Sequence, residues 1–185
     1  MCDLELFKID LQRLDEGGET FHYNLGDQFF EALDASEVSG GDLKATVDVR
    51  PVTHGSFELE FRAEGTVVVP CDLCLDDMRQ PISAGGRLIA RFGDVQAAPG
   101  ECDTDGGDIV IVDEGEGIID VSWLIYEFIA LAIPIKHVHE AGECNPEMVK
   151  ALGGYMSGGS EEQDGGHATD PRWSELEKLK TIIKD

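Results

Sequence analysis

Basic residues are scarce in this chain. Its 14 lysines and arginines stand against 38 aspartates and glutamates, which gives a formal net charge of -24. Binding to a phosphate backbone depends on Lys and Arg side chains that release counterions, so this charge disfavours direct binding to nucleic acid. If the chain works near nucleic acid, we expect it to act through a protein partner that is itself basic.

Several motifs are also missing from the sequence. It has no Gly-rich phosphate loop with Lys and Ser or Thr, no dinucleotide fingerprint and no nucleophile elbow. No apolar run approaches the length of a membrane span, and residues 1–12 read as an amphipathic strand and not as a secretory leader. We therefore expect a cytoplasmic, non-enzymatic protein with reduced cysteines and with neither a membrane partner nor a small-molecule substrate.

The hydrophobic pattern predicts an α+β fold for residues 1–150, with an antiparallel β-meander or partial barrel. Residues 43–49 alternate strictly between apolar and polar side chains, which is typical of a half-buried antiparallel strand. Pro70 suits the end of the following strand, because proline cannot donate to the ladder. The predicted strands cover residues 7–14, 20–25, 42–50, 57–69, 81–92 and 108–112.

One main helix is predicted over residues 118–133, with Asp120 or Ser122 as its cap and Pro134 at its end. Its apolar face is broad, so we expect it to cover one side of the sheet. A shorter helix is predicted over residues 27–33, capped by Asp27. Residues 93–107 are rich in acids, Gly and Pro and predict a mobile loop.

The C-terminal part of the chain has a different character. Residues 151–170 predict a flexible linker of Gly, Ser and acids, and residues 171–185 predict an amphipathic helix with Asp170 as its N-cap. This helix either docks back on the domain or is offered to an acidic or RNA-bearing partner. The residues expected to contact such a partner give the helix its basic and aromatic character: Arg172, Trp173, Lys178 and Lys180.

Five residues could form a metal site. Cys71 and Cys74 form a Cys-x-x-Cys in a predicted turn, and His137, His139 and Cys144 follow the main helix. Two cysteines two residues apart, joined by a His and a Cys from elsewhere in the fold, would bind zinc tetrahedrally. His139 and Cys144 are five positions apart and can share one metal, with His137 as a competing ligand.

Other interpretations of these residues remain open. The two cysteines of the motif could be plain structural thiols or a thiol–disulfide redox pair, and both histidines could lie on a polar surface loop. The neighbouring Asp76 and Asp77 should raise the thiol pKa, which would weaken a redox nucleophile.

Taken in order, these segments resemble the YceD-like family of large-subunit (23S) ribosomal RNA accumulation proteins. The resemblance is carried by the valine-rich strand before Cys71-x-x-Cys74, by residues 119–134, by His139 and Cys144, and by residues 170–180. It implies a cytoplasmic, non-enzymatic factor in ribosome biogenesis, and it makes the three cysteines and His139 family motif positions. The partner expected on this basis is a large-subunit ribosomal protein or assembly factor, with contact to ribosomal RNA only indirect.

Overall fold

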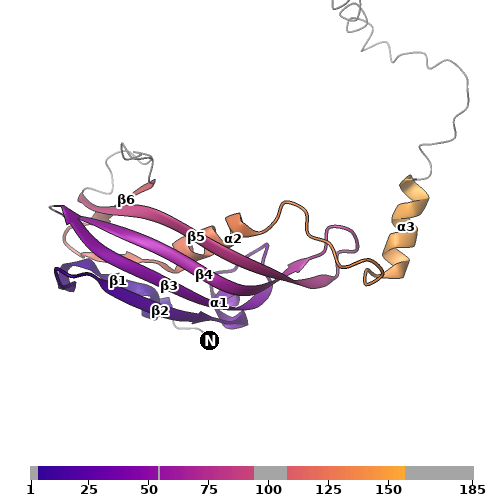
Figure 1. The fold of residues 1–185 in the computed structure, drawn as a ribbon, viewed down its shortest axis with the longest axis horizontal. Coiled ribbons are helices and arrows are strands. Elements are labelled where there is room, and N and C mark those ends of the chain that lie inside the picture. Colours follow the sequence, from indigo (N-terminus) through magenta and orange to yellow (C-terminus); the bar gives the residue numbers. More distant parts are fainter. Residues whose placement is uncertain (1–3, 54, 94–107, 157–185) are drawn as a thin grey trace, which may run out of the picture. The chain divides into compact units, whose positions relative to one another are not determined.

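The structure is a computed structural model that describes residues 4–53, 55–93 and 108–156 (Figure 1). The predicted acidic loop, apart from Gly93, lies outside the described residues. So do residues 157–185, which hold most of the predicted linker and the whole predicted C-terminal helix.

The fold is α+β with open, mostly antiparallel sheets, as the sequence predicts. A five-stranded sheet has the order β2-β3-β4-β5-β6, and a two-stranded sheet pairs β1 with β7. All neighbouring strands are antiparallel except β5 and β6, which are parallel. The strands are β1 (Lys8–Asp10), β2 (Glu19–Leu25), β3 (Gly40–Thr53), β4 (Ser56–Pro70), β5 (Asp77–Gly93), β6 (Asp108–Asp113) and β7 (Ile118–Asp120).

The core forms on one face of the long strands. In β3 the apolar members of the alternating run are all buried: Leu43, Ala45, Val47 and Val49. Leu59 and Phe61 continue the same layer on β4, opposite Val49 and Val47 in the register. This inward and outward alternation is the period-two signal that fixes the register of a half-buried sheet.

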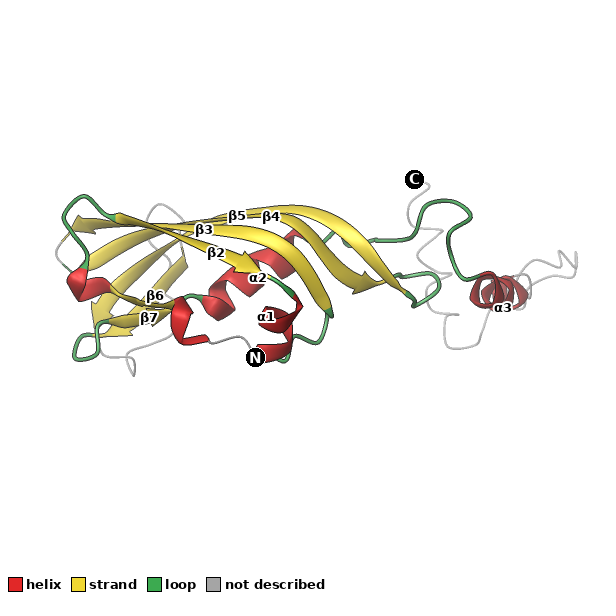
Figure 2. Cartoon of the chain, turned by 90° about the horizontal axis from the view of Figure 1, so that it is seen from below, coloured by secondary structure: helices red, strands yellow, loops and turns green. Residues whose placement is uncertain are grey.

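Helix α2 (Ser122–Ala132) is the main covering helix of the described residues, and Figure 2 shows it running along one face of the sheet. It packs mainly on β5 and also on β4. Gly86 of β5 makes room for the ring of Phe128, because any Cβ at that position would overlap the ring. Phe128 also packs against Phe61, with 5.0 Å between the ring centroids.

The start of α2 differs from the prediction. Residues 118–120 form strand β7, which pairs with Lys8–Asp10, so the helix begins only at Ser122. Neither predicted cap holds the N-cap position, which is Val121. Asp120, one residue before it, still contacts the helix start, because its Oδ1 accepts from the Ser122 backbone N–H at 2.9 Å and from the Ser122 hydroxyl at 2.6 Å. Residues 118–120, which a helical pattern alone would assign to the first turn of the helix, are paired in a sheet instead.

The N-terminal elements also differ in detail. Within residues 7–14 the strand covers only Lys8–Asp10, between the 3-10 helices Leu4–Phe7 and Leu11–Arg13. Helix α1 spans Asp27–Ala32, and its N-cap is Gly26, not Asp27. The Asp27 carboxylate instead accepts a hydrogen bond from the Gly41 N–H at 2.9 Å, which ties the helix to the start of β3.

A third helix, α3 (Pro146–Met156), begins within the predicted domain, and its residues 151–156 lie where the sequence predicts the start of the linker. Its sequence signal is Asn145 before Pro146: the Asn145 Oδ1 accepts from the Glu147 N–H at 3.1 Å, and proline suits a first helical position. The chain divides into two compact units, residues 1–149 and 150–185, and both sites discussed below lie in the first. None of the helices in the described segments is long and apolar enough to cross a membrane.

Candidate metal centre

The Cys-x-x-Cys lies at the tip of the longest hairpin. Strands β4 and β5 pair from Ser56 and Arg91 to Pro70 and Asp77, which leaves residues 71–76 as a tight connection. The Cys71 N–H donates to the Asp76 carbonyl and the Leu75 N–H donates to the Cys71 carbonyl, both at 2.9 Å. Leu75 has a φ of 64°, a left-handed conformation that closes the turn. We call residues 71–76 the knuckle.

A second segment comes to the knuckle after α2. Two hydrogen bonds between Asp72 and His137 join it there: the Asp72 N–H donates to the His137 carbonyl at 3.0 Å, and the His137 N–H donates to the Asp72 carboxylate Oδ2 at 2.7 Å. Further along, the Asn145 amide donates to Asp76 Oδ2 at 3.2 Å. These three contacts hold residues 137–145 against the hairpin tip, although about seventy positions separate the partners in sequence.

Four of the predicted ligands meet at this junction. The ligand atoms of Cys71, Cys74, His139 and Cys144 all lie within 4.8 Å of one another. Cys74 Sγ lies 3.4 Å from His139 Nδ1, while Cys144 Sγ lies 3.9 Å from both His139 Nδ1 and Cys71 Sγ. Tetrahedral zinc bound by sulfur and nitrogen requires edges of about 3.8 Å between sulfurs and about 3.5 Å from sulfur to nitrogen. The donors are close enough to hold a metal ion, and the three distances above lie near these edges.

The environment of the cluster shifts the pKa of two of its thiols in opposite directions. Cys71 and Cys74 are buried, while His139 and Cys144 are half-buried at the outer side. Burial raises the pKa of Cys71, but contacts with the backbone N–H groups of Cys74, His139 and Leu73 outweigh it and lower that pKa to about 6. Burial, together with the two neighbouring sulfurs, raises the pKa of Cys144 to about 11. The Cys71 thiol is thus prepared for metal binding, whereas the Cys144 thiol would need a neighbouring cation to ionise it.

The low pKa of Cys71 corrects one expectation. From the sequence, the carboxylates of Asp76 and Asp77 should raise the thiol pKa. In the structure, Asp76 instead contributes its backbone carbonyl to the Cys71 N–H and its carboxylate to Asn145. The backbone N–H groups that point at the sulfur decide the sign of the shift.

The other candidate residues are not in the cluster. The His137 ring is held elsewhere, with its Nδ1 2.9 Å from the Pro134 carbonyl and its Nε2 3.6 Å from Asp72 Oδ1. The proposed partner-binding residues of the C-terminal helix lie outside the described residues. The sequence analysis did not single out Asp72 and Asn145, which support the cluster. Their sequence signal is that each directly follows a cysteine of the cluster.

Comparison with known proteins identifies a family. The family model described as Large ribosomal RNA subunit accumulation protein YceD matches residues 59–180, well over half of the chain. The matched region includes the four clustered residues and the whole of β6, β7 and α2. No curated protein matches the chain, and no solved structure does.

Proposed function

This chain belongs to the YceD family, and on that premise we propose that it supports the accumulation of large-subunit ribosomal RNA by binding and without catalysis. The family match is the observation that carries this proposal. The role would place the protein in the cytoplasm with the assembling ribosome. Its partner would be a basic ribosomal protein or an assembly factor of the large subunit.

The charge supports a protein partner over direct contact with RNA. A net charge of -24 repels phosphate backbones and attracts basic proteins, which many RNA-binding proteins are. In this proposal the folded sheet is an acidic scaffold, and contact with ribosomal RNA is indirect. The C-terminal segment, with Arg172, Trp173, Lys178 and Lys180, would add a second contact with the particle.

We further propose that the cluster holds a structural zinc ion. Three sulfurs and one imidazole nitrogen make a complete tetrahedral set from the protein alone, which is the pattern of structural sites and leaves no open position for a substrate. Bound zinc would supply a cross-link between the hairpin tip and the segment after α2. His139, with Nδ1 facing the sulfurs, would be the nitrogen ligand in preference to His137.

A thiol–disulfide activity is the second candidate, because the pKa of about 6 at Cys71 suits a redox nucleophile. Such a nucleophile must be reached by its substrate, however, and the exposed fraction of Cys71 is 0%. Measured alkylation of the protein as purified, without a chelator, separates the two candidates. Rapid modification of Cys71 at neutral pH would favour the redox activity, and protection would favour a structural site.

The test of the proposed function is sedimentation of the tagged full-length protein in ribosome gradients from its own cell lysate. We expect it with large-subunit precursors at low salt, and we expect moderate salt to release it because the contact depends on charge. Deletion should lower large-subunit ribosomal RNA. A Cys74→Ser variant should complement the deletion less well than the unmodified protein. Cys102→Ser, the same change at a cysteine that is not among the four clustered residues, should complement it fully.

Sedimentation at the top of the gradient at both salt concentrations would contradict the proposal. A protein that contains zinc but whose deletion leaves ribosomal RNA unchanged would instead be a structural metal module with an unrelated role.

A further inference from the structure

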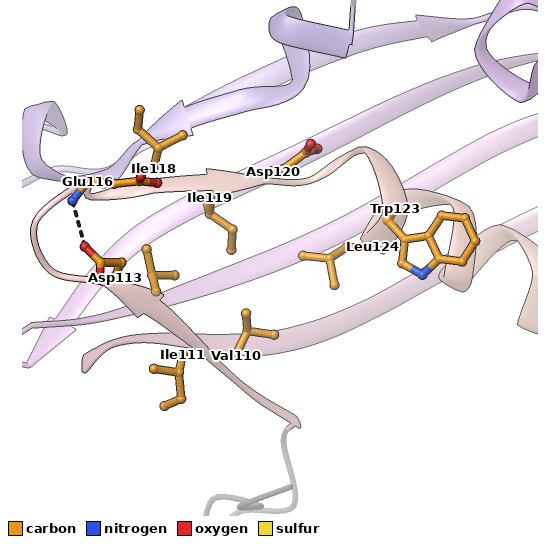
Figure 3. A pocket seen from close by; sticks show the side chains of 10 residues that line it. Val110, Ile111, Asp113, Glu116, Ile118, Ile119, Asp120, Trp123 and Leu124 are labelled. Carbon is orange, nitrogen blue, oxygen red and sulfur yellow. Dashed lines mark hydrogen bonds between the residues drawn. The ribbon is translucent and has the colours of Figure 1, made fainter. Parts of the chain in front are cut away.

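The far end of the sheet holds an apolar pocket that the metal centre does not use. It encloses about 390 Å³ between β6, β7 and the first turn of α2. Figure 3 shows Ile119 and Leu124 on one side pointing toward Val110 of β6 on the other. Trp123 and Ile118 stand at its margin and are 49% and 44% exposed, which is high for large apolar side chains.

The pocket exists because two consecutive strands diverge. Strands β6 and β7 are joined by a short turn, yet β6 pairs with β5 in one sheet and β7 pairs with β1 in the other. Hydrogen bonds from the Gly115 and Glu116 N–H groups to Asp113 Oδ1, at 2.8 and 3.0 Å, fix the turn. The opening between the strands is therefore a built feature of the fold.

Strand β6 also presents an open edge. Among the described strands it pairs only with β5, so its other side has backbone N–H and C=O groups that no described strand pairs. Its central residues, Ile109, Val110 and Ile111, are aliphatic and only half-buried. An apolar edge strand is a template for an added strand, and proteins usually protect it.

Acidic side chains surround this edge. Asp113, Glu116 and Asp120 line the pocket together with its apolar residues. Lys8 is a base beside them: its ammonium is bound to Glu5 at 2.6 Å and also interacts with Asp120 and Glu116, and this one positive charge leaves the three acids in excess. A ligand that fits must be apolar where it enters the pocket and basic where it passes the rim.

We propose that this surface, the β6 edge with its pocket, binds an extended, lysine- or arginine-bearing segment of a protein partner as an added strand. Main-chain hydrogen bonds to β6 supply the affinity, alternate apolar side chains enter the pocket, and the basic side chains between them meet the acidic rim. The choice of a basic partner rests on the proposed function. Pairing of β6 with a second copy of the chain is disfavoured, because it would bring the same acidic rims together.

The test uses the full-length chain and a short fluorescent peptide that alternates lysine and valine. We expect saturable binding at low salt that weakens as salt rises. Peptide binding should slow hydrogen exchange of the amides of residues 108–113. In a Trp173→Phe background it should shift the emission of Trp123.

Matched controls separate the contributions to binding. N-methylation of alternate amides in the peptide should abolish binding, and exchange of its valines for serines should weaken it strongly. Glu116→Lys should weaken binding about tenfold, because it replaces an attractive charge by a repulsive one. Glu31→Lys, the same change at an exposed residue of α1, should leave it nearly unchanged.

Four results would overturn the inference: no saturable binding, equal binding of the N-methylated peptide, equal binding by Glu116→Lys, or exchange protection outside residues 108–113. Concentration-dependent protection of β6 without peptide would also overturn it, because a second copy would then be the occupant. None of these measurements involves ribosomes. Peptide binding at the β6 edge can therefore fail while the protein still sediments with ribosome precursors, and it can hold while that sedimentation fails.

Discussion

Removal of the proposed zinc should loosen one end of the molecule and leave the sheet folded. Cys74 and His139 are 65 positions apart in sequence, so a metal that joins them closes a long loop. By the entropy of loop closure, a cross-link of this span stabilises the fold by about 4 kcal/mol. The hydrophobic cluster contains none of the four clustered residues and draws on β1 to β7, α1 and α2, so it should survive metal loss.

The assay is thermal unfolding of the full-length protein with and without a strong zinc chelator. A loss of about 4 kcal/mol corresponds to a fall in Tm of roughly 10 °C for a domain of this size. Far-UV circular dichroism before the transition should stay that of a β-rich protein. Hydrogen exchange should quicken in residues 71–76 and 137–145 and stay slow in residues 43–49.

Cys144→Ser should reproduce the effect of the chelator, and a chelator should then have no further effect on it. Cys102→Ser serves as the control and should melt like the unmodified protein. An unchanged Tm after chelation of a protein shown to contain zinc would refute the cross-link argument. Collapse of the whole sheet on chelation would refute the claim that the core stands without the metal.

The remaining predictions concern single side chains. His139→Ala should reduce bound zinc well below one ion per chain, whereas His137→Ala should retain it because the His137 ring faces Pro134 and Asp72 and not the sulfurs; elemental analysis of the purified proteins decides. Gly86→Ala should cost about 2 kcal/mol or more in denaturant unfolding, since the new Cβ overlaps the α2 phenylalanine, and Gly85→Ala, whose Cβ would lie 3.3 Å from its nearest atom, should cost much less. Tyr23→Phe should leave stability equal or raise it by up to about 1 kcal/mol in the same assay, because the buried hydroxyl has no hydrogen-bond partner among the described residues.

The sequence was most informative where one local pattern decides the structure. The alternation of residues 43–49 identifies both the strand and its buried face, because a half-buried strand has a period of two. The four clustered residues could likewise be named, because the Cys-x-x-Cys and the His and Cys five positions apart each chelate on a local turn. Which histidine faces the sulfurs could not be decided, since it depends on the long-range contact between His137 and Asp72.

Other features depend on contacts that no local pattern reports. Residues 118–120 have helix-like spacing, but pairing with Lys8–Asp10 draws them into β7 and delays the helix to Ser122. The parallel pairing of β6 with β5 is equally invisible, because β6 alone reads as any short apolar strand. Helix α3 was missed although Asn145 and Pro146 are a start signal, because the glycines within it favour the prediction of a linker.

The two proposed sites lie at opposite ends of one strand, and this arrangement makes them separable. The knuckle adjoins Asp77, whereas β6 pairs with β5 only from Leu88 onward, roughly 35 Å away at the rise of an antiparallel strand. Helix α2 connects them, with Leu124 in the pocket and the metal-binding segment after its last turn. Because α2 is packed on β5 by Phe128 in its middle, loosening of the knuckle should stop there. Metal removal should therefore leave peptide binding at β6 intact; if both are lost together, α2 is not the rigid support that its packing implies.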